Sequence, residues 1–193
     1  MEKKDNKTKA KGIEIQINIP KGVEVKLENN KIFVKGEKGE LKKELNSLIK
    51  VEKINSDGEK VIIKADSDRK KIRAIAGTTE ADIKNMIKGV SQGVTYKLRV
   101  VYSHFPINLK IQGDTLLIEN FLGEKYPRKA KILEGVTVNI KGRDLELYGI
   151  DKEKVAQTAA NIESATAIKN FDPRVFQDGI YIYEKDGKSL LEQ

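Results

Sequence analysis

A G-x-S-x-G pattern at residues 89–93 is the first candidate for catalysis, because this pattern carries the nucleophilic serine of many hydrolases. That arrangement needs a strand before Ser91 and a helix after it, whereas the periodicity here predicts a helix before and a strand after. The glycines therefore indicate the end of a helix. His104 is the only histidine and there is no cysteine, so we expect no metal site. We expect a structural or surface role for His104, with contact to a phosphate as the alternative.

Two glutamates recur at matching places, as a pair of catalytic carboxylates would. Glu40 and Glu124 each follow a glycine in two similar segments of the chain. A repeated turn explains this recurrence better than acid–base catalysis. The chain also has neither a P-loop nor a dinucleotide-binding fingerprint, so the sequence predicts a protein that is not an enzyme and needs no cofactor.

The basic clusters are the stronger chemical signal. Residues 125–131 contain four basic side chains and no acidic one, and a second cluster occupies residues 69–73. If residues 125–132 form a strand, Lys125, Lys129 and Lys131 lie on one face, as a row suited to a phosphate backbone. An ordinary solvated strand face is the alternative.

A segment near the C-terminus, residues 166–183, mixes cations, an amide and aromatic rings. Arg174 could bind phosphate through its planar guanidinium, and Tyr181 could stack on a base or a sugar. Lys169 and Gln177 lie in the same segment. A final strand whose tyrosines only cover the surface explains the pattern equally well.

These residues must be positioned by a repeated fold. The apolar pattern of residues 23–63 recurs at residues 107–147 with a constant offset of 84 positions. In each copy the pattern alternates with period 2, as in antiparallel strands, and then changes to the helical period of 3.6. The second helix is expected to begin after Asp151 as its N-cap. We predict an α+β protein with two tandem copies of one small fold, each an antiparallel-rich sheet system packed with one main helix.

The expected boundaries follow from this repeat. Residues 1–12 are a lysine-rich flexible tail, residues 13–93 the first copy, residues 94–185 the second copy with an extra C-terminal segment, and residues 186–193 a second tail. No stretch is apolar enough for a membrane span or a secretory signal, so we expect a soluble intracellular protein.

The net charge of +8 favours a polyanionic partner. The excess is uneven, because residues 1–93 hold 22 basic and 15 acidic side chains whereas residues 94–193 hold 15 and 14. The charge of each half, taken alone, therefore points to the first copy as the binding unit.

Three stretches of the second copy, residues 120–125, 149–163 and 172–181, resemble the ribosomal protein L6 family in its archaeal and eukaryotic form, as does the opening stretch at residues 19–23. The resemblance implies a structural constituent of the large ribosomal subunit in the cytoplasm. It also implies binding to large-subunit rRNA near the sarcin–ricin loop and the translation-factor docking region, beside neighbouring ribosomal proteins and with no membrane contact. The lysine- and glycine-rich tail of bacterial relatives is absent here.

In that family the second domain supplies much of the RNA contact, in conflict with the charge of the two halves. The local clusters and the resemblance together give the expected rRNA-binding residues, which are Lys125, Arg128, Lys129, Lys131, Lys169, Arg174, Gln177 and Tyr181. The alternative function is a protein–protein adaptor that docks partners through exposed sheet edges.

Overall fold

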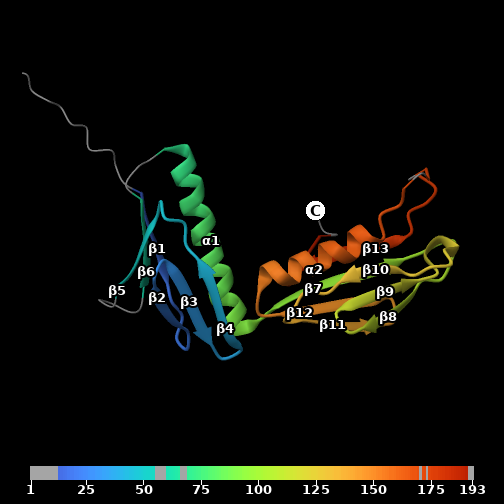
Figure 1. The fold of residues 1–193 in the computed structure, drawn as a ribbon, viewed down its shortest axis with the longest axis horizontal. Helices are drawn as coiled ribbons and strands as arrows, with labels where there is room; N and C mark the ends of the chain where they lie inside the picture. The colour runs from blue at the N-terminus through green and yellow to red at the C-terminus, as the bar shows by residue number, and fades with distance from the viewer. Residues whose placement is uncertain (1–12, 55–59, 66–68, 170, 173, 191–193) are drawn as a thin grey trace, which may run out of the picture. The chain divides into compact units, whose positions relative to one another are not determined.

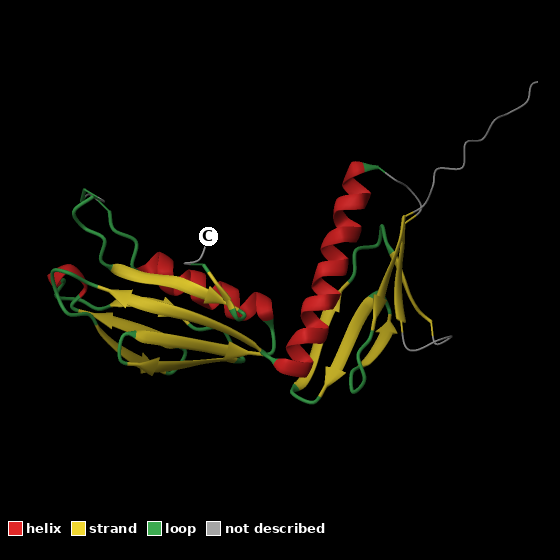
Figure 2. Ribbon diagram, turned by 180° about the vertical axis from the view of Figure 1, so that it is seen from behind, coloured by secondary structure: helices red, strands yellow, loops and turns green. Residues whose placement is uncertain are grey.

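The computed structural model describes residues 13–54, 60–65, 69–169, 171–172 and 174–190. The chain divides into two compact units, Met1–Ser91 and Gln92–Gln193. Each unit combines antiparallel strands with one main helix, and the predicted tandem α+β fold is confirmed (Figure 1, Figure 2). The tail expected at residues 1–12 lies outside the described residues. Neither main helix, within the described part of the chain, is long and apolar enough to cross a membrane.

The first unit contains two three-stranded antiparallel sheets. One has the order β1 (Ile13–Asn18), β6 (Lys60–Ala65) and β5 (Lys50–Ile54), and the other the order β2 (Glu24–Glu28), β3 (Lys31–Gly36) and β4 (Gly39–Glu44). Helix α1 (Lys70–Gln92) adds Ala76, Ile83 and Val90 to the core that both sheets line. As expected, a glycine ends the helix, because Gly93 follows it with a φ of +79°.

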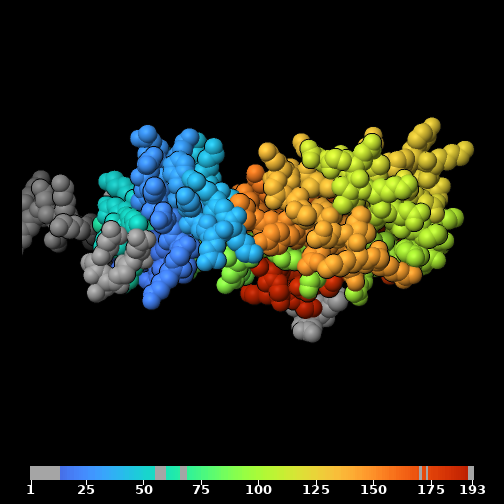
Figure 3. All heavy atoms as spheres, turned by 90° about the horizontal axis from the view of Figure 1, so that it is seen from below, coloured from blue at the N-terminus to red at the C-terminus, as the bar shows by residue number. Residues whose placement is uncertain are grey.

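The second unit repeats this plan and enlarges it. Its larger sheet has the order β11 (Val136–Lys141), β12 (Asp144–Gly149), β7 (Val94–Val101), β13 (Gly179–Lys185) and β14 (Lys188–Ser189). The smaller sheet has the order β10 (Arg128–Lys131), β9 (Thr115–Glu119) and β8 (Asn108–Gln112). Figure 3 shows how β8 and β9 adjoin β11 and β12 on the surface of this unit.

Helix α2 (Lys152–Ala165) covers one face of the second unit's sheets. Its predicted N-cap is confirmed, since the Asp151 side chain accepts hydrogen bonds from the backbone N–H groups of Glu153 and Lys154. One stripe of the helix is buried, and its members are Val155, Thr158, Ala159 and Ile162. Their spacing of three and four residues places this stripe against the core formed by the strands.

The 84-residue offset maps β2 onto β8, β3 onto β9 and β6 onto β12, but two parts of the second unit depart from it. A short 3-10 helix η1 (Phe121–Gly123) stands where β4 would begin, so β10 starts only at Arg128 and the strand predicted from residue 125 was wrong there. The second departure is the hairpin β13–β14. It takes up residues 188–189, which were expected to belong to a tail.

Candidate nucleic-acid interface

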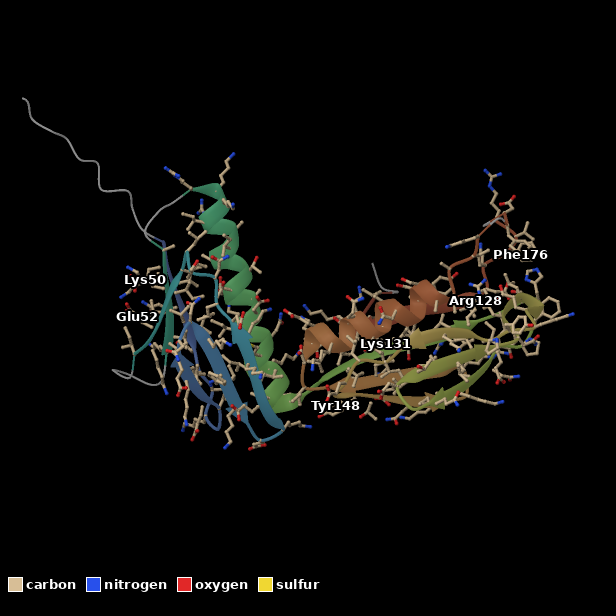
Figure 4. The ribbon with its side chains drawn as sticks, viewed as in Figure 1. Lys50, Glu52, Arg128, Lys131, Tyr148 and Phe176 are labelled. Atoms are coloured by element: carbon tan, nitrogen blue, oxygen red, sulfur yellow. The ribbon has the colours of Figure 1, made fainter. Side chains whose placement is uncertain are left out.

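Strand β10 carries two exposed lysines side by side. Lys129 and Lys131 alternate with the buried Ala130, so both ammonium groups point to solvent on the same strand face. Neither ammonium has a carboxylate partner among the residues that the structure describes. Lys125 is also exposed, but it precedes the strand. The predicted row of three lysines on one strand face is therefore a pair on β10, with the third lysine on the adjoining loop. Figure 4 places Lys131 alongside α2.

Arg128 makes a clamp between β10 and the C-terminal end of α2. Its Nε and Nη2 atoms donate to the two carboxylate oxygens of Glu124 at 2.9 and 2.6 Å. Its Nη1 atom donates to the backbone oxygens of Ala165 at 3.1 Å and Ala167 at 2.9 Å. The guanidinium also lies over the fully buried Phe121 ring, with 4.2 Å from Cζ to the ring centroid.

This clamp changes the role expected for Arg128. A guanidinium has five N–H donors, and Arg128 donates four hydrogen bonds within the chain. The two bonds to Glu124 hold the pKa of its carboxyl group below the usual value. The positive charge of Arg128 also stabilises the last carbonyl groups of α2. Arg128 is therefore mainly a structural residue that positions the lysines next to it, and one N–H remains for a phosphate.

The outer edge of β10 is covered by α2. Asn161 Nδ2 donates to the Lys131 backbone oxygen at 3.1 Å, and Thr158 Oγ1 accepts from the Leu133 N–H at 3.2 Å. Two backbone groups at the end of this edge that could otherwise pair with a foreign strand are thus already bonded. These bonds occupy the C-terminal end of this edge, whereas β8 and β11 are edge strands of their sheets as well.

The remaining predicted residues lie on the chain that follows α2. Lys169, Arg174 and Gln177 are exposed, and none of their side chains forms an ion pair or hydrogen bond among the described residues. Tyr181 is at the start of β13, where its hydroxyl donates to the Gln177 backbone oxygen at 3.1 Å. Lys169, Gln177 and Tyr181 therefore lie near the end of α2 that Arg128 clamps.

A buried carboxylate, which sequence reasoning missed, fixes this chain to the strands. Asp178 Oδ1 accepts from the backbone N–H groups of Ser103 at 2.6 Å and His104 at 3.3 Å, and Oδ2 lies 2.7 Å from His104 Nδ1. The His104 ring stacks on Phe176, with 4.5 Å between centroids. His104 thus has the structural role expected for it, and Asp178 could not be singled out because its partners are 74 and 75 residues away.

Asp178 is nearly inaccessible, with 1% of its side chain exposed. Burial raises the pKa of this carboxyl group, but the hydrogen bonds from Ser103 and His104 outweigh burial, so the pKa lies below its usual value. The carboxylate is thereby a fixed anchor for the loop that carries Arg174 and Phe176.

The positive excess of the first unit is partly cancelled where it lies on the sheet. Two lysines of β3 each face a glutamate on both neighbouring strands, Lys35 with Glu24 and Glu40, and Lys31 with Glu28 and Glu44. Lys31 and Glu44 form an ion pair of 2.9 Å. The net charge of residues 1–93 therefore overstates the number of lysines on this sheet face that can bind a phosphate.

The candidates for catalysis do not assemble into a site. The Ser91 hydroxyl donates to the backbone oxygens of Ile87 and Lys88, inside α1, and Glu124 is bound by Arg128. No group of carboxylates and histidine within the described residues could hold a metal ion.

Comparison with known proteins agrees with this arrangement. The family model described as "Ribosomal protein L6" matches the chain twice, at residues 19–93 and 105–179. The chain is 48% identical over 181 residues to the large ribosomal subunit protein uL6 of Ignicoccus hospitalis, covering 92% of this chain and 97% of that protein. The uL6 proteins of Methanococcus vannielii and Aeropyrum pernix are 48% and 46% identical and cover 91% and 89% of this chain, and 95% and 93% of those proteins.

Replacement of Arg128 by lysine should destabilise the second unit, because an ammonium cannot bridge Glu124 and two backbone oxygens at once. We expect a loss of about 1–3 kcal/mol in the free energy of unfolding, measured by urea denaturation. Lys129→Gln, one residue away, is the control and should stay within about 0.5 kcal/mol of the wild type. Equal stability of Arg128→Lys and the wild type would contradict the clamp.

Asp178→Asn tests the anchor through pH. Because the folded-state pKa of Asp178 lies below the unfolded value of about 3.9, its charge stabilises the fold above that value and this contribution is lost as pH falls through the folded pKa. The variant should be less stable by about 1–3 kcal/mol at neutral pH. The difference between the two proteins should shrink on acidification, in unfolding curves recorded between neutral pH and about pH 3. A difference that stays constant would refute the anchor.

Proposed function

This chain belongs to the ribosomal protein L6 family, and on that basis we propose that it binds large-subunit rRNA through the exposed cations of its second unit. Membership gives it a structural, non-enzymatic role in the large ribosomal subunit, and so a place in the cytoplasmic ribosome. The observation that carries the proposed interface is the pair of exposed lysines, Lys129 and Lys131, on β10. Neither has a carboxylate partner in the described chain, and Arg128 ties their strand to the end of α2.

Such an interface would act by shape and charge. An A-form RNA helix presents its phosphates and 2′-hydroxyl groups to proteins, so a binding partner needs cations at fixed positions more than it needs base readout. Strand β10 is fixed on one side by β9 and on the other by α2, so its lysines are positioned before RNA arrives. Lys169 and Arg174 would extend the contact onto the loop after α2.

The proposal includes a location. The stretches that resemble the family imply rRNA near the sarcin–ricin loop, other ribosomal proteins as neighbours, and translation factors nearby. One of these stretches contains Glu124 of the clamp, and another contains the anchor Asp178. The adaptor alternative loses only the end of the β10 edge, since β8 and β11 are also edge strands of their sheets.

The double variant Lys129→Gln with Lys131→Gln should weaken RNA binding and flatten its dependence on salt. Removing one phosphate-binding cation reduces the slope of log K against log salt by about 0.7–0.9, so we expect a decrease of about 1.5 for the pair. Filter binding of the full chain to large-subunit rRNA between 50 and 200 mM salt, roughly the range over which such cations show their effect, measures this.

The matched control for this experiment is Lys110→Gln. Lys110 lies on β8 of the same sheet but forms an ion pair with Glu119 at 3.0 Å, so its replacement should leave the slope nearly unchanged. An affinity that does not respond to salt in the wild-type protein would favour the adaptor alternative instead.

Photocrosslinking within purified ribosomes tests the location. Probes placed at Lys125, Lys129, Lys169 and Arg174, one at a time, should crosslink to large-subunit rRNA, because these side chains are exposed and face no carboxylate in the described chain. The crosslinked nucleotides are mapped by reverse-transcription stops. A second set of probes, one at a time at exposed lysines of residues 13–93, completes the test. Crosslinks from that set and none from these four positions would place the interface on the first unit.

A further inference from the structure

A groove of about 450 Å³ lies between the C-terminal end of α2 and the chain that leads into β13. This volume is within the range of about 300–1,000 Å³ that is usual for small-ligand sites. The groove's lining includes Glu163, Ser164, Thr166, Phe176, Gln177 and Tyr181. It contains two residues of the proposed interface, Gln177 and Tyr181, and Lys169 follows Ile168 of its wall.

The walls of the groove are held in place before any ligand binds. The buried Thr166 hydroxyl donates to the Glu163 backbone oxygen and accepts from the Ile180 N–H, so it ties the end of α2 to β13. Arg128 holds the carbonyl of Ala167 from outside. A preformed groove loses little conformational entropy when it is filled.

The Tyr181 ring lies close to Gly179. A Cβ atom on Gly179 would lie 3.0 Å from the Tyr181 Cζ and Oη atoms, so a larger residue there would push the ring aside by a few tenths of an ångström. The Tyr181 hydroxyl donates to the Gln177 backbone oxygen, which leaves the faces of the ring free of that bond. Tyr181 is 43% exposed, so part of the ring can be contacted from solvent.

The lining combines aromatic rings with polar groups that have no partner among the described residues. Tyr181 provides a π face, whereas one face of Phe176 already stacks on His104 and its ring serves as an apolar wall. The side chains of Gln177 and Ser164 form no hydrogen bond within that part of the chain. Aromatic rings beside an amide and a hydroxyl are the groups with which proteins stack and read unpaired bases. The Glu163 carboxylate, also in the lining, accepts a hydrogen bond of 3.5 Å from the Ile182 N–H at Oε1. Its remaining lone pairs would repel a phosphate but accept a hydrogen bond from an amino group.

We infer that this groove binds the base of an unpaired rRNA nucleotide, and this inference rests on the proposed function. Lys169, exposed next to the groove, is suited to the phosphate of that nucleotide, whereas Glu163 keeps phosphate out of the groove itself. The carboxylate can accept a hydrogen bond from the exocyclic amino group at the pairing edge of adenine or cytosine. A paired base is excluded, because its edge is engaged and its faces are stacked in the helix.

The test is chemical probing of large-subunit rRNA, transcribed in vitro, with and without the full chain. Dimethyl sulfate reports the pairing edge of adenine and cytosine, so a base in the groove should lose its reactivity when the protein binds. Ala167→Trp fills the groove from an exposed position in its lining, and Gln177→Ala removes the amide without adding bulk. Thr137→Trp, on the exposed face of β11, is the matched control.

Wild-type protein and Thr137→Trp should protect the same unpaired adenine or cytosine. Ala167→Trp and Gln177→Ala should restore its reactivity, with Ala167→Trp binding about tenfold more weakly and keeping its salt slope. Protection that is identical in wild type and both groove variants overturns the inference while rRNA binding stands. If wild-type protein binds no rRNA, the inference and the proposed function both fail.

Discussion

The arrangement of the second unit depends on the Arg128 guanidinium. Its planar group joins a carboxylate on the preceding loop to two carbonyl groups at the end of α2, and it covers the buried Phe121 ring. No other type of side chain has enough donors in one plane to do this. The clamp fixes β10, which presents the exposed lysines, and the end of α2, which forms one wall of the groove. The partly buried Arg128 therefore positions the exposed Lys129 and Lys131.

Duplication explains why the binding features lie where they do. Both units use the same two-sheet plan with one helix, which supplies a core but no unusual surface. The second unit departs from the plan at η1–β10 and at the chain from α2 to β14, and Arg128 connects these two departures. The groove and the Asp178 anchor belong to the same region. The shared core thus supports both copies, whereas the added segments of one copy carry the proposed interface.

Periodicity predicted the repeated fold well because burial enforces it, and the offset of 84 places three pairs of strands in register. It failed at residues 120–127, where Asn120 and Leu122 adopt positive φ values of 59° and 49° that no apolar pattern signals. The lysines of β10 were found from their alternation. The bonds from Arg128 to the end of α2 and the Asp178–His104 contact were not, because they join residues 37 to 75 positions apart and depend on side-chain geometry.

The strand order has a consequence for how the protein is made. All elements of the first unit have been synthesised once the chain reaches Gln92, so this unit can fold while the rest is still being translated. The second unit cannot, because its central strand β7 pairs with β13, near the end of the chain. Until β13 and α2 emerge, β7 lacks a neighbour and β10 has an open edge. A nascent chain that stalls before residue 179 would therefore carry one finished unit and one that exposes unpaired strands to aggregation.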